Sequence, residues 1–468
     1  MADENVSGFI SFAKSTLVFF IGNTLSKIIT IALLPLYTNA LPSDDYGYFD
    51  VSVTLVTLLT SFLYCDIWAS VMRFMRDDLK GEAPKVVTAS GWVVFGGSTI
   101  FYYLLGVLAW LFFEIPSLGY ILLYGTAMNL QTMFSYIARG WGDNVRFAIS
   151  GIINAVVNVT LSIVLILVLG WGYEALYFAF VFGSATQCTY LFLALRMWRR
   201  IARPKAAQVR ELFMYSAPLC LNSVAYWLLN SLGRVVVSVV LSFHASGIFA
   251  VASKFGSAIN LATTCFTYAW QDISFTSNIR SGSFYSRATT QYVAFLMDSL
   301  ALLLPFVALL FPVLVGSGYE EAYNVIPSFL VVAIVSAIST FIGNIFYVIK
   351  DTKTIGKTMA ISCLVNVLFT YPLTMTLGLN GTNAAIVIAF VANIAIRLKI
   401  LRNRLGMRLS LSVVLPRVVL VLLSGVVYMF NSSYVSGVFF ICLLVLMIFL
   451  YRRRIAGIIK SISLKEKR

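Results

Sequence analysis

The sequence predicts an all-α integral membrane protein with about fourteen transmembrane helices. Of the 468 residues, 60% are hydrophobic and 11% are charged, and the mean hydropathy is +0.89. An ordinary soluble domain carries about a quarter charged residues. The apolar segments are too long for barrel strands, and a bilayer otherwise admits only helices. Fourteen such segments would repeat about every 33 residues, which fits a span of about 20 residues plus a short turn.

The apolar segments define the predicted helices in chain order. The first six cover about 12–36, 47–70, 86–113, 118–138, 147–169 and 173–197. The next six cover about 212–241, 246–275, 288–315, 322–349, 356–377 and 383–401, and two more cover 411–430 and 435–451. The long basic connection from Arg196 to Arg210 separates the halves. We therefore expect six-helix bundles at 1–200 and 201–405, and two helices with a basic tail at 406–468.

The two halves align without gaps when the chain is shifted by 200 residues. The matching pairs are Leu41/Leu241, Gly47/Gly247, Phe49/Phe249, Val51/Val251, Cys65/Cys265 and Ala69/Ala269. With six helices in each half, both halves have the same orientation in the membrane, so the repeat is parallel. Two parallel six-helix bundles around a central cavity are the architecture of an alternating-access transporter.

The basic residues indicate the orientation of the helices. The alternate turns at 73–85, 139–146, 196–210, 280–287, 350–357, 397–417 and 452–468 carry Lys and Arg, whereas the other turns carry acids, His244 or no charge. By the positive-inside rule, both termini are expected in the cytoplasm. The net charge of +15 is spread over these turns and meets membrane lipids. No basic segment is interleaved with stacking aromatic residues, which argues against nucleic-acid binding.

Three cations lie well inside predicted helices: Lys27, Arg234 and Lys254. At 1.5 Å per residue, all three lie about 10–15 Å inside the outer boundary of the membrane. A cation facing lipid would cost about 2.5–3.5 kcal/mol or more, so a shared hydrated cavity is the favoured location. Such a cavity would attract an anionic ligand, for example a phosphate or pyrophosphate.

The alternative for these cations is internal pairing with intramembrane acids. The candidates are Asp50, Asp66, Asp272 and Asp298. Of these, Asp50 lies at a suitable depth, and we expect it to pair with Lys27. Asp298, and with it Asp50, is a candidate for binding H⁺ or Na⁺ and thus for coupling transport to an ion gradient. The alternative for Asp298 is a helix-end residue at the level of the lipid headgroups.

Aromatic and polar residues on three helices are candidate glycan contacts, since rings with polar groups stack on sugars. They are Tyr64, Trp68, Tyr226, Trp227, Tyr268, Trp270 and Gln271. The competing interpretation is a membrane-interface belt, where Trp and Tyr are enriched. The six cysteines have no metal-ligand spacing. No nucleotide-binding loop occurs. We expect no cofactor, no metal and no catalytic residue.

Three motifs resemble those of a known family. They are Pro35-Leu36-Tyr37-Thr38 with Leu41-Pro42 and Tyr46-Gly47, then Tyr215-Ser216-Ala217-Pro218, and Ala269-Trp270-Gln271. The chain thereby resembles the bacterial polysaccharide flippases, the O-antigen and capsule repeat-unit exporters of the multidrug/oligosaccharidyl-lipid/polysaccharide superfamily. It departs from the family pattern at Cys220 and Leu221 and at Asp272, where that family often has proline.

The resemblance implies a flippase in the bacterial cytoplasmic membrane that moves undecaprenyl-pyrophosphate-linked oligosaccharides to the outer leaflet. It implies a polysaccharide polymerase and glycosyltransferases as partners. Superfamily members are described with cationic central cavities, in agreement with the interpretation of Lys27, Arg234 and Lys254. One alternative is a drug or cation antiporter of the same superfamily, which would need an acidic cavity. Another is a membrane glycan polymerase or ligase, which the short, Arg-free outer turns argue against.

Overall fold

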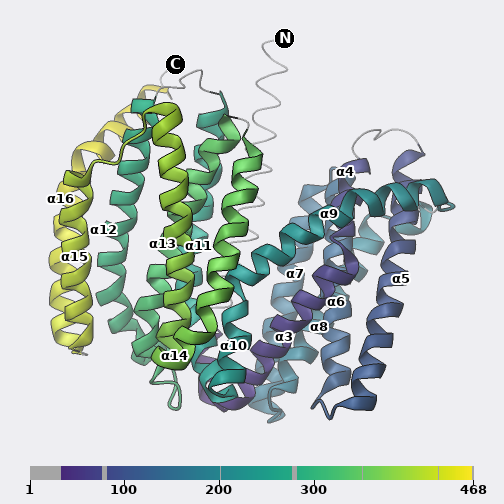
Figure 1. The fold of residues 1–468 in the computed structure, drawn as a ribbon. Coiled ribbons are helices and arrows are strands. Elements are labelled where there is room, and N and C mark those ends of the chain that lie inside the picture. Colours follow the sequence, from purple (N-terminus) through teal and green to yellow (C-terminus); the bar gives the residue numbers. More distant parts are fainter. Residues whose placement is uncertain are drawn as a thin grey trace. The chain divides into compact units, whose positions relative to one another are not determined.

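A computed structural model describes residues 33–75, 82–200, 202–276, 282–349, 351–430 and 432–465, and these are almost entirely helical (Figure 1). The described residues fall into two compact units. Unit 1 comprises Met1–Lys254, Ser317–Tyr319 and Cys363–Ile386, and unit 2 comprises Phe255–Gly316, Glu320–Ser362 and Val387–Arg468. The helices α11 and α14 each contribute to both units. The predicted division at residues 200 and 405 follows the sequence repeat rather than these units and stays a prediction.

Unit 1 contains nine helices from the N-terminal part of the described chain, plus two short helical turns. They are α2 (Leu34–Ala40), α3 (Ser43–Tyr64), α4 (Ile67–Met75), α5 (Ala83–Phe112), α6 (Leu118–Gly140), α7 (Asn144–Ile163) with η1 (Val164–Val168), α8 (Glu174–Ala194) with η2 (Met197–Arg199), α9 (Ala206–Asn230) and α10 (Leu232–Val240). It also takes the first part of α11 (Phe243–Thr276) and the middle of α14 (Thr352–Leu405).

The core of unit 1 lies where α4 packs against α5, α6 and α9, and where α8 packs against α6 and α7. Its fully buried residues include Tyr64 on α3, Ile67 and Met75 on α4 and Met133 on α6. Local sequence sets the helix ends: Pro35 and Pro84 stand in the first turns of α2 and α5, where proline removes no needed N–H group.

Unit 2 contains α12 (Gly282–Leu314), α13 (Ala322–Val348), α15 (Leu411–Met429) and α16 (Ser433–Lys465), with the remaining parts of α11 and α14. The helix α12 packs against α13, α15 and α16. Figure 1 shows α12, α15 and α16 running side by side. At one end, the rings of Tyr323 and Tyr428 stack, and each hydroxyl donates to the backbone carbonyl of the other residue, at 2.9 and 2.7 Å.

The predicted helix ranges from 47–70 onward all fall on helices, but two of them are interrupted and two others are joined. The range 47–70 breaks at Cys65 and Asp66, which both have positive φ, and the range 212–241 breaks at Ser231. The ranges 356–377 and 383–401 form one kinked element, α14, with φ +61° at Gly378. The first predicted range, 12–36, lies almost wholly outside the described residues.

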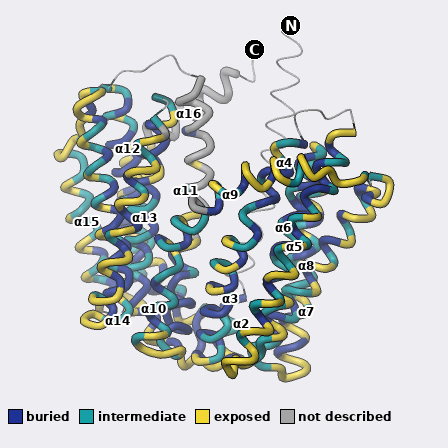
Figure 2. Tube along the Cα trace, turned by 45° about the vertical axis from the view of Figure 1, so that its right-hand side comes forward, coloured by how far each residue is buried: buried dark blue, intermediate teal, exposed yellow. Residues whose placement is uncertain are grey.

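The protein is a multi-pass integral membrane protein. Ten helices in the described part of the chain are long and apolar enough to cross a bilayer. Figure 2 shows exposed residues along α15, and these include Leu411, Leu415, Val419, Leu422 and Met429. Large apolar side chains on an outer helix face suit contact with lipid tails. The predicted total of fourteen helices is not established by these ten.

Candidate functional site

Two glycines bring the helices α3 and α11 of unit 1 close together. A Cβ atom on Gly47 or on Gly247 would overlap the backbone of the other helix. Small residues permit such a backbone approach in membrane helix pairs. Asp50 follows Gly47 by one helical turn and Lys254 follows Gly247 by two, and the acid and the cation lie within electrostatic range of each other.

Arg234 pairs with Asp50 at this point. Its Nη1 donates to Asp50 Oδ1 at 3.0 Å, and its Nη2 donates to Ser253 Oγ on α11 at 3.3 Å. Arg234 lies in the first turn of α10, immediately after the break at Ser231, so this break sets the direction from which its side chain reaches α3. The Asp50 side chain is 9% exposed and that of Arg234 is 27% exposed, so the acid is buried and the cation remains partly accessible.

The charges at this site do not cancel. Lys254 is half-buried on α11 and close enough to interact electrostatically with both Asp50 and Arg234. Within the described residues, no carboxylate lies at ion-pair distance from Lys254, so the site has two cations and one acid. The second carboxylate oxygen of Asp50, Oδ2, is buried and accepts no hydrogen bond from any described group. We call Asp50, Arg234, Ser253 and Lys254 the charged site.

Tyrosine and phenylalanine rings surround the Asp50 end of the charged site. Tyr46 and Tyr124 are buried, and both lie within electrostatic range of Asp50. The ring of Phe49 contacts those of Tyr46 and Tyr124, at centroid distances of 6.3 Å in both cases. Such a surrounding excludes water and strengthens the attraction between the ion-paired groups.

The sequence-predicted cations therefore divide into two groups. The structure brings Arg234 and Lys254 together, whereas Lys27 lies outside the described residues. The partner seen for Asp50 is Arg234, and the expected pairing of Asp50 with Lys27 stays a prediction because Lys27 is not among the described residues. The pairing alternative thus applies to Arg234, and the cavity interpretation of Lys254 and Lys27 stays a prediction. Asp66, another candidate acid, accepts a hydrogen bond from the Ser223 hydroxyl.

The aromatic candidates of α3, α4 and α9 are mostly packed inside unit 1. Tyr64 and Trp68 belong to the hydrophobic core, and the Tyr64 hydroxyl is 2.9 Å from Thr99 Oγ1. Trp227 is buried and donates from Nε1 to the Thr54 carbonyl at 3.0 Å. Its neighbour Tyr226 is 62% exposed. Packing inside unit 1 explains the positions of Tyr64, Trp68 and Trp227. A role of these residues and of Tyr226 as glycan contacts stays a prediction.

The candidates near the end of α11 belong to unit 2. Trp270 is buried and its ring stacks on Phe284 and Phe341, at centroid distances of 5.9 and 4.7 Å. The side chains of Tyr268, Gln271 and Asp272 lie outside the described part of the structure. The glycan contacts of Tyr268 and Gln271 therefore stay predictions, and so does the pairing of Asp272 with a buried cation.

Asp298, the candidate for ion coupling in unit 2, forms an ion pair. Its Oδ2 accepts from Arg417 Nε at 3.1 Å, joining α12 to α15. The side chain of Asp298 is 5% exposed and that of Arg417 is 25% exposed. Asp298 is thus buried within a helix interface, and Arg417 lies on α15, within the predicted helix range 411–430.

Arg397 is a buried cation that the sequence did not single out. It lies on α14 and is 4% exposed. Its Nε donates to Thr358 Oγ1 at 3.0 Å and its Nη1 donates to the Ser339 carbonyl at 2.8 Å. Asn393, one turn earlier, donates to the Thr358 carbonyl at 3.0 Å. A search for polar residues at helical spacing around Arg397 would have indicated this network.

The fold is that of transporters of the MOP superfamily. The structure resembles "Lipid II flippase MurJ, inward closed conformation", with a TM-score of 0.70 and 15% identity over 94% of this chain and all of that chain. It also resembles an inward-facing multidrug resistance MATE family transporter of the MOP superfamily, with a TM-score of 0.60 and 12% identity over 81% of this chain and 98% of that chain. Among curated proteins, none matches the sequence.

The sequence profile of the family described as "Polysaccharide biosynthesis protein" matches residues 12–270, which is more than half of the 468-residue chain. The chain belongs to this family. The resemblance drawn from the motifs at Pro35–Gly47 and Tyr215–Pro218 is thereby confirmed, and both motifs lie inside the matched range.

Proposed function

We propose that this protein is a flippase that moves a lipid-linked oligosaccharide, joined to its polyprenyl chain by pyrophosphate, across the bacterial cytoplasmic membrane. The substrate would be the repeat unit of a surface polysaccharide such as O-antigen or capsule. The observation that carries the proposal is the charged site, in which a partly exposed Arg234 and a half-buried Lys254 share one buried acid. An excess of cations inside the bilayer favours an anionic headgroup.

The family and the fold support the polysaccharide and lipid parts of the proposal. A flippase lowers the barrier to passing a polar, charged headgroup through hydrocarbon while the polyprenyl tail stays in lipid. Arg234 suits this role because its guanidinium group can form two parallel hydrogen bonds to phosphate oxygens. Lys254 would add a compact charge to the same headgroup, and Lys27 would join them.

The same geometry suggests how an ion could enter the cycle. A pyrophosphate that binds Arg234 competes with Asp50, since both acceptors use the same guanidinium group. Asp50 already has one buried oxygen without a donor. Losing Arg234 would leave a buried carboxylate unpaired, and taking up a proton would neutralise it. Substrate binding would thereby couple to an H⁺ gradient at Asp50.

The test is export in cells that carry single variants. We expect Arg234→Ala and Lys254→Ala to reduce surface polysaccharide and to raise the cytoplasmic-leaflet pool of lipid-linked intermediate, and the same for Lys27→Ala. Lys357→Ala, an exposed cation at the start of α14, is the matched control and should export normally. Normal export by all three site variants at normal expression would overturn the proposal.

An antiporter for organic cations is the second candidate function. The buried Asp50, with one oxygen free of hydrogen bonds, is the observation in its favour. Such a protein should keep its transport when Lys254 is removed, because the loss of a cation favours a cationic substrate. Reduced export of the polysaccharide in Lys254→Ala cells would decide for the flippase, because the antiporter is expected to keep its transport in this variant.

A further inference from the structure

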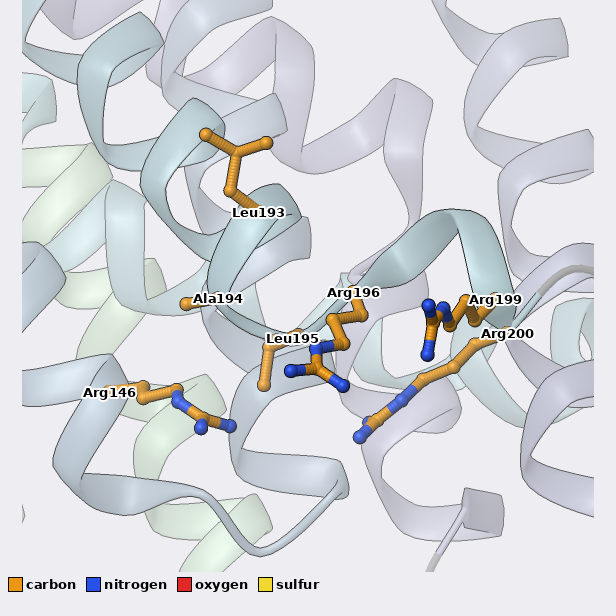
Figure 3. Close-up of a pocket in the computed structure, with 7 residues that line it drawn as sticks. All are labelled: Arg146, Leu193, Ala194, Leu195, Arg196, Arg199 and Arg200. Carbon is orange, nitrogen blue, oxygen red and sulfur yellow. The ribbon is translucent and has the colours of Figure 1, made fainter.

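Four arginines surround one surface cavity in unit 1, on the side that the basic turns predict to be cytoplasmic. The cavity has a volume of about 630 Å³ and is lined by Arg146, Leu193, Ala194, Leu195, Arg196, Arg199 and Arg200. Figure 3 shows the guanidinium groups of Arg146, Arg196 and Arg200 extending into a common space. None of these residues belongs to the charged site.

The end of α8 explains how the arginines gather. The helix stops at Ala194, Leu195 is buried, and Arg196 has a left-handed conformation with φ +49°. This residue turns the chain into the short helix η2, whose Met197 is buried. The anchored turn holds Arg196, Arg199 and Arg200 opposite Arg146, which lies in the first turn of α7.

Internal acids neutralise little of this charge. Asp143, the N-cap of α7, pairs with Arg146 Nη1 at 2.7 Å and also accepts from the Arg146 backbone N–H at 3.0 Å. Among the ion pairs of the described residues, none involves Arg196, Arg199 or Arg200. Burial lowers the pKa of Arg200, and the nearby positive charge of Arg146 lowers it further, while Asp143 acts in the opposite direction.

Two buried N–H donors, one on the cavity-lining Arg200 and one on the Trp141 ring beneath it, lack an acceptor among the described groups. The Arg200 guanidinium lies over the Trp141 ring, with Cζ 4.1 Å from the ring centroid. Arg200 Nη1 and Trp141 Nε1 are both buried, and neither forms a hydrogen bond to any described group. Leaving a buried donor unsatisfied costs about 1–3 kcal/mol, more for a charged group. Both groups are donors only, so the missing partner is an acceptor, and a phosphate group supplies several acceptor oxygens.

The surroundings of the cavity are apolar as well as basic. Leu193 lines it and is 56% exposed, and the neighbouring rings of Phe192 and Trp198 are also exposed, with their centroids 5.7 Å apart. Exposed apolar side chains beside a cluster of arginines fit a ligand that has both an acyl chain and an anionic headgroup. A free phosphate would use only the arginines.

We propose that the cavity formed by Arg146, Arg196, Arg199 and Arg200 binds the phosphate headgroup of an anionic membrane lipid at the cytoplasmic surface of unit 1. The guanidinium groups hold the phosphate oxygens by charge-assisted hydrogen bonds, and the acyl chains lie along Leu193, Phe192 and Trp198. This inference does not depend on the proposed transport substrate.

Retention of lipid by the purified, full-length protein in detergent tests the proposal. Native mass spectrometry would count phosphatidylglycerol and phosphatidylcholine bound from an equal mixture. We expect wild type to retain phosphatidylglycerol selectively and Arg196→Gln/Arg199→Gln to lose this retention by about tenfold or more. Arg203→Gln/Arg210→Gln removes two exposed arginines that do not line the cavity, and it should stay within about twofold of wild type.

Two further measurements test whether the variant is folded and whether the bound phosphate belongs to a lipid or to a free ion. Arg196 and Arg199 are exposed, so their double variant should unfold at the wild-type temperature. Inorganic pyrophosphate is then added as a competitor. Equal lipid retention by the cavity variant and the control variant would overturn the site. Displacement of the lipid by an equimolar amount of pyrophosphate would overturn the lipid assignment and indicate a free phosphate ligand.

Discussion

Gly47 and Gly247, 200 residues apart in the sequence, face each other where α3 crosses α11 in unit 1. A Cβ on Gly47 would lie 1.9 Å from the Phe243 carbonyl oxygen, and a Cβ on Gly247 would lie 2.0 Å from that of Ser43. The contact is reciprocal, as a two-fold relation between the repeats would produce. Beside it, Ser43 Oγ lies 2.5 Å from His244 Nδ1.

Alanine at either glycine should therefore push the two helices apart. The obstacle is backbone rather than a flexible side chain, so we expect Gly47→Ala and Gly247→Ala each to lower the free energy of unfolding by about 1–3 kcal/mol. Thermal unfolding of the purified protein in detergent measures this. Gly151→Ala on α7, where an added Cβ meets nothing within 4 Å, is the control and should lose no stability, because alanine favours the helix over glycine. Equal stability of all three variants would contradict the close contact.

The ion pair of the charged site predicts non-additive effects on stability. Asp50→Ala would leave the cation of Arg234 without its buried acceptor, at a cost of about 1–3 kcal/mol, since Arg234 is partly exposed. Arg234→Met should cost a similar amount, whereas the double variant should lose less than the sum of the two. The measurement is thermal unfolding of the four proteins in detergent. Additive losses would show that the two residues act separately.

The sequence predicted the helices well, because apolar length alone marks a membrane span. It did not predict the breaks at Cys65–Asp66 and at Ser231, where neither glycine nor proline stands. It placed Arg234 and Asp50 on helices, but the position of a residue along a helix does not fix the direction of its side chain around that helix. The break before α10 sets that direction for Arg234, so the pairing of Arg234 with Asp50 could not be derived from the sequence.

The Asp298–Arg417 pair predicts a structural effect in unit 2. We expect Asp298→Asn to lower stability by about 1–3 kcal/mol, because Asp298 is buried and Arg417 loses its charged acceptor. Transport per folded molecule, followed from pH 6 to pH 8 (about the range of physiological titration), should keep its pH profile. A variant that is fully stable but whose transport no longer responds to pH would instead make Asp298 the coupling residue.

The start of α14 predicts a pH-dependent stability. Asp351 caps this helix. Its Oδ1 accepts a hydrogen bond from the Thr354 backbone N–H at 3.1 Å, and its Oδ2 accepts one from Thr354 Oγ1 at 2.6 Å. Oδ2 also accepts from Arg404 Nη1 at 2.5 Å. The hydrogen bonds from Thr354, and then Arg404, lower the pKa of the Asp351 carboxyl. A lowered pKa in the folded state means that the ionised carboxylate stabilises the fold above its unfolded pKa of about 3.9, and that this contribution disappears as the pH falls through the folded value.

Asp351→Ala should accordingly be less stable than wild type at pH 7, and the difference should shrink below about pH 4. Asp351→Asn removes the carboxylate charge but keeps a side chain that can cap the helix. Asparagine caps a helix about as well as aspartate, so this variant should keep part of the stability at pH 7 and lose the dependence on pH. Thermal unfolding in detergent across the pH range gives both quantities. A stability difference between wild type and Asp351→Ala that stays constant down to pH 3 (about one unit below the ordinary carboxyl pKa) would show that the carboxylate charge does not stabilise α14.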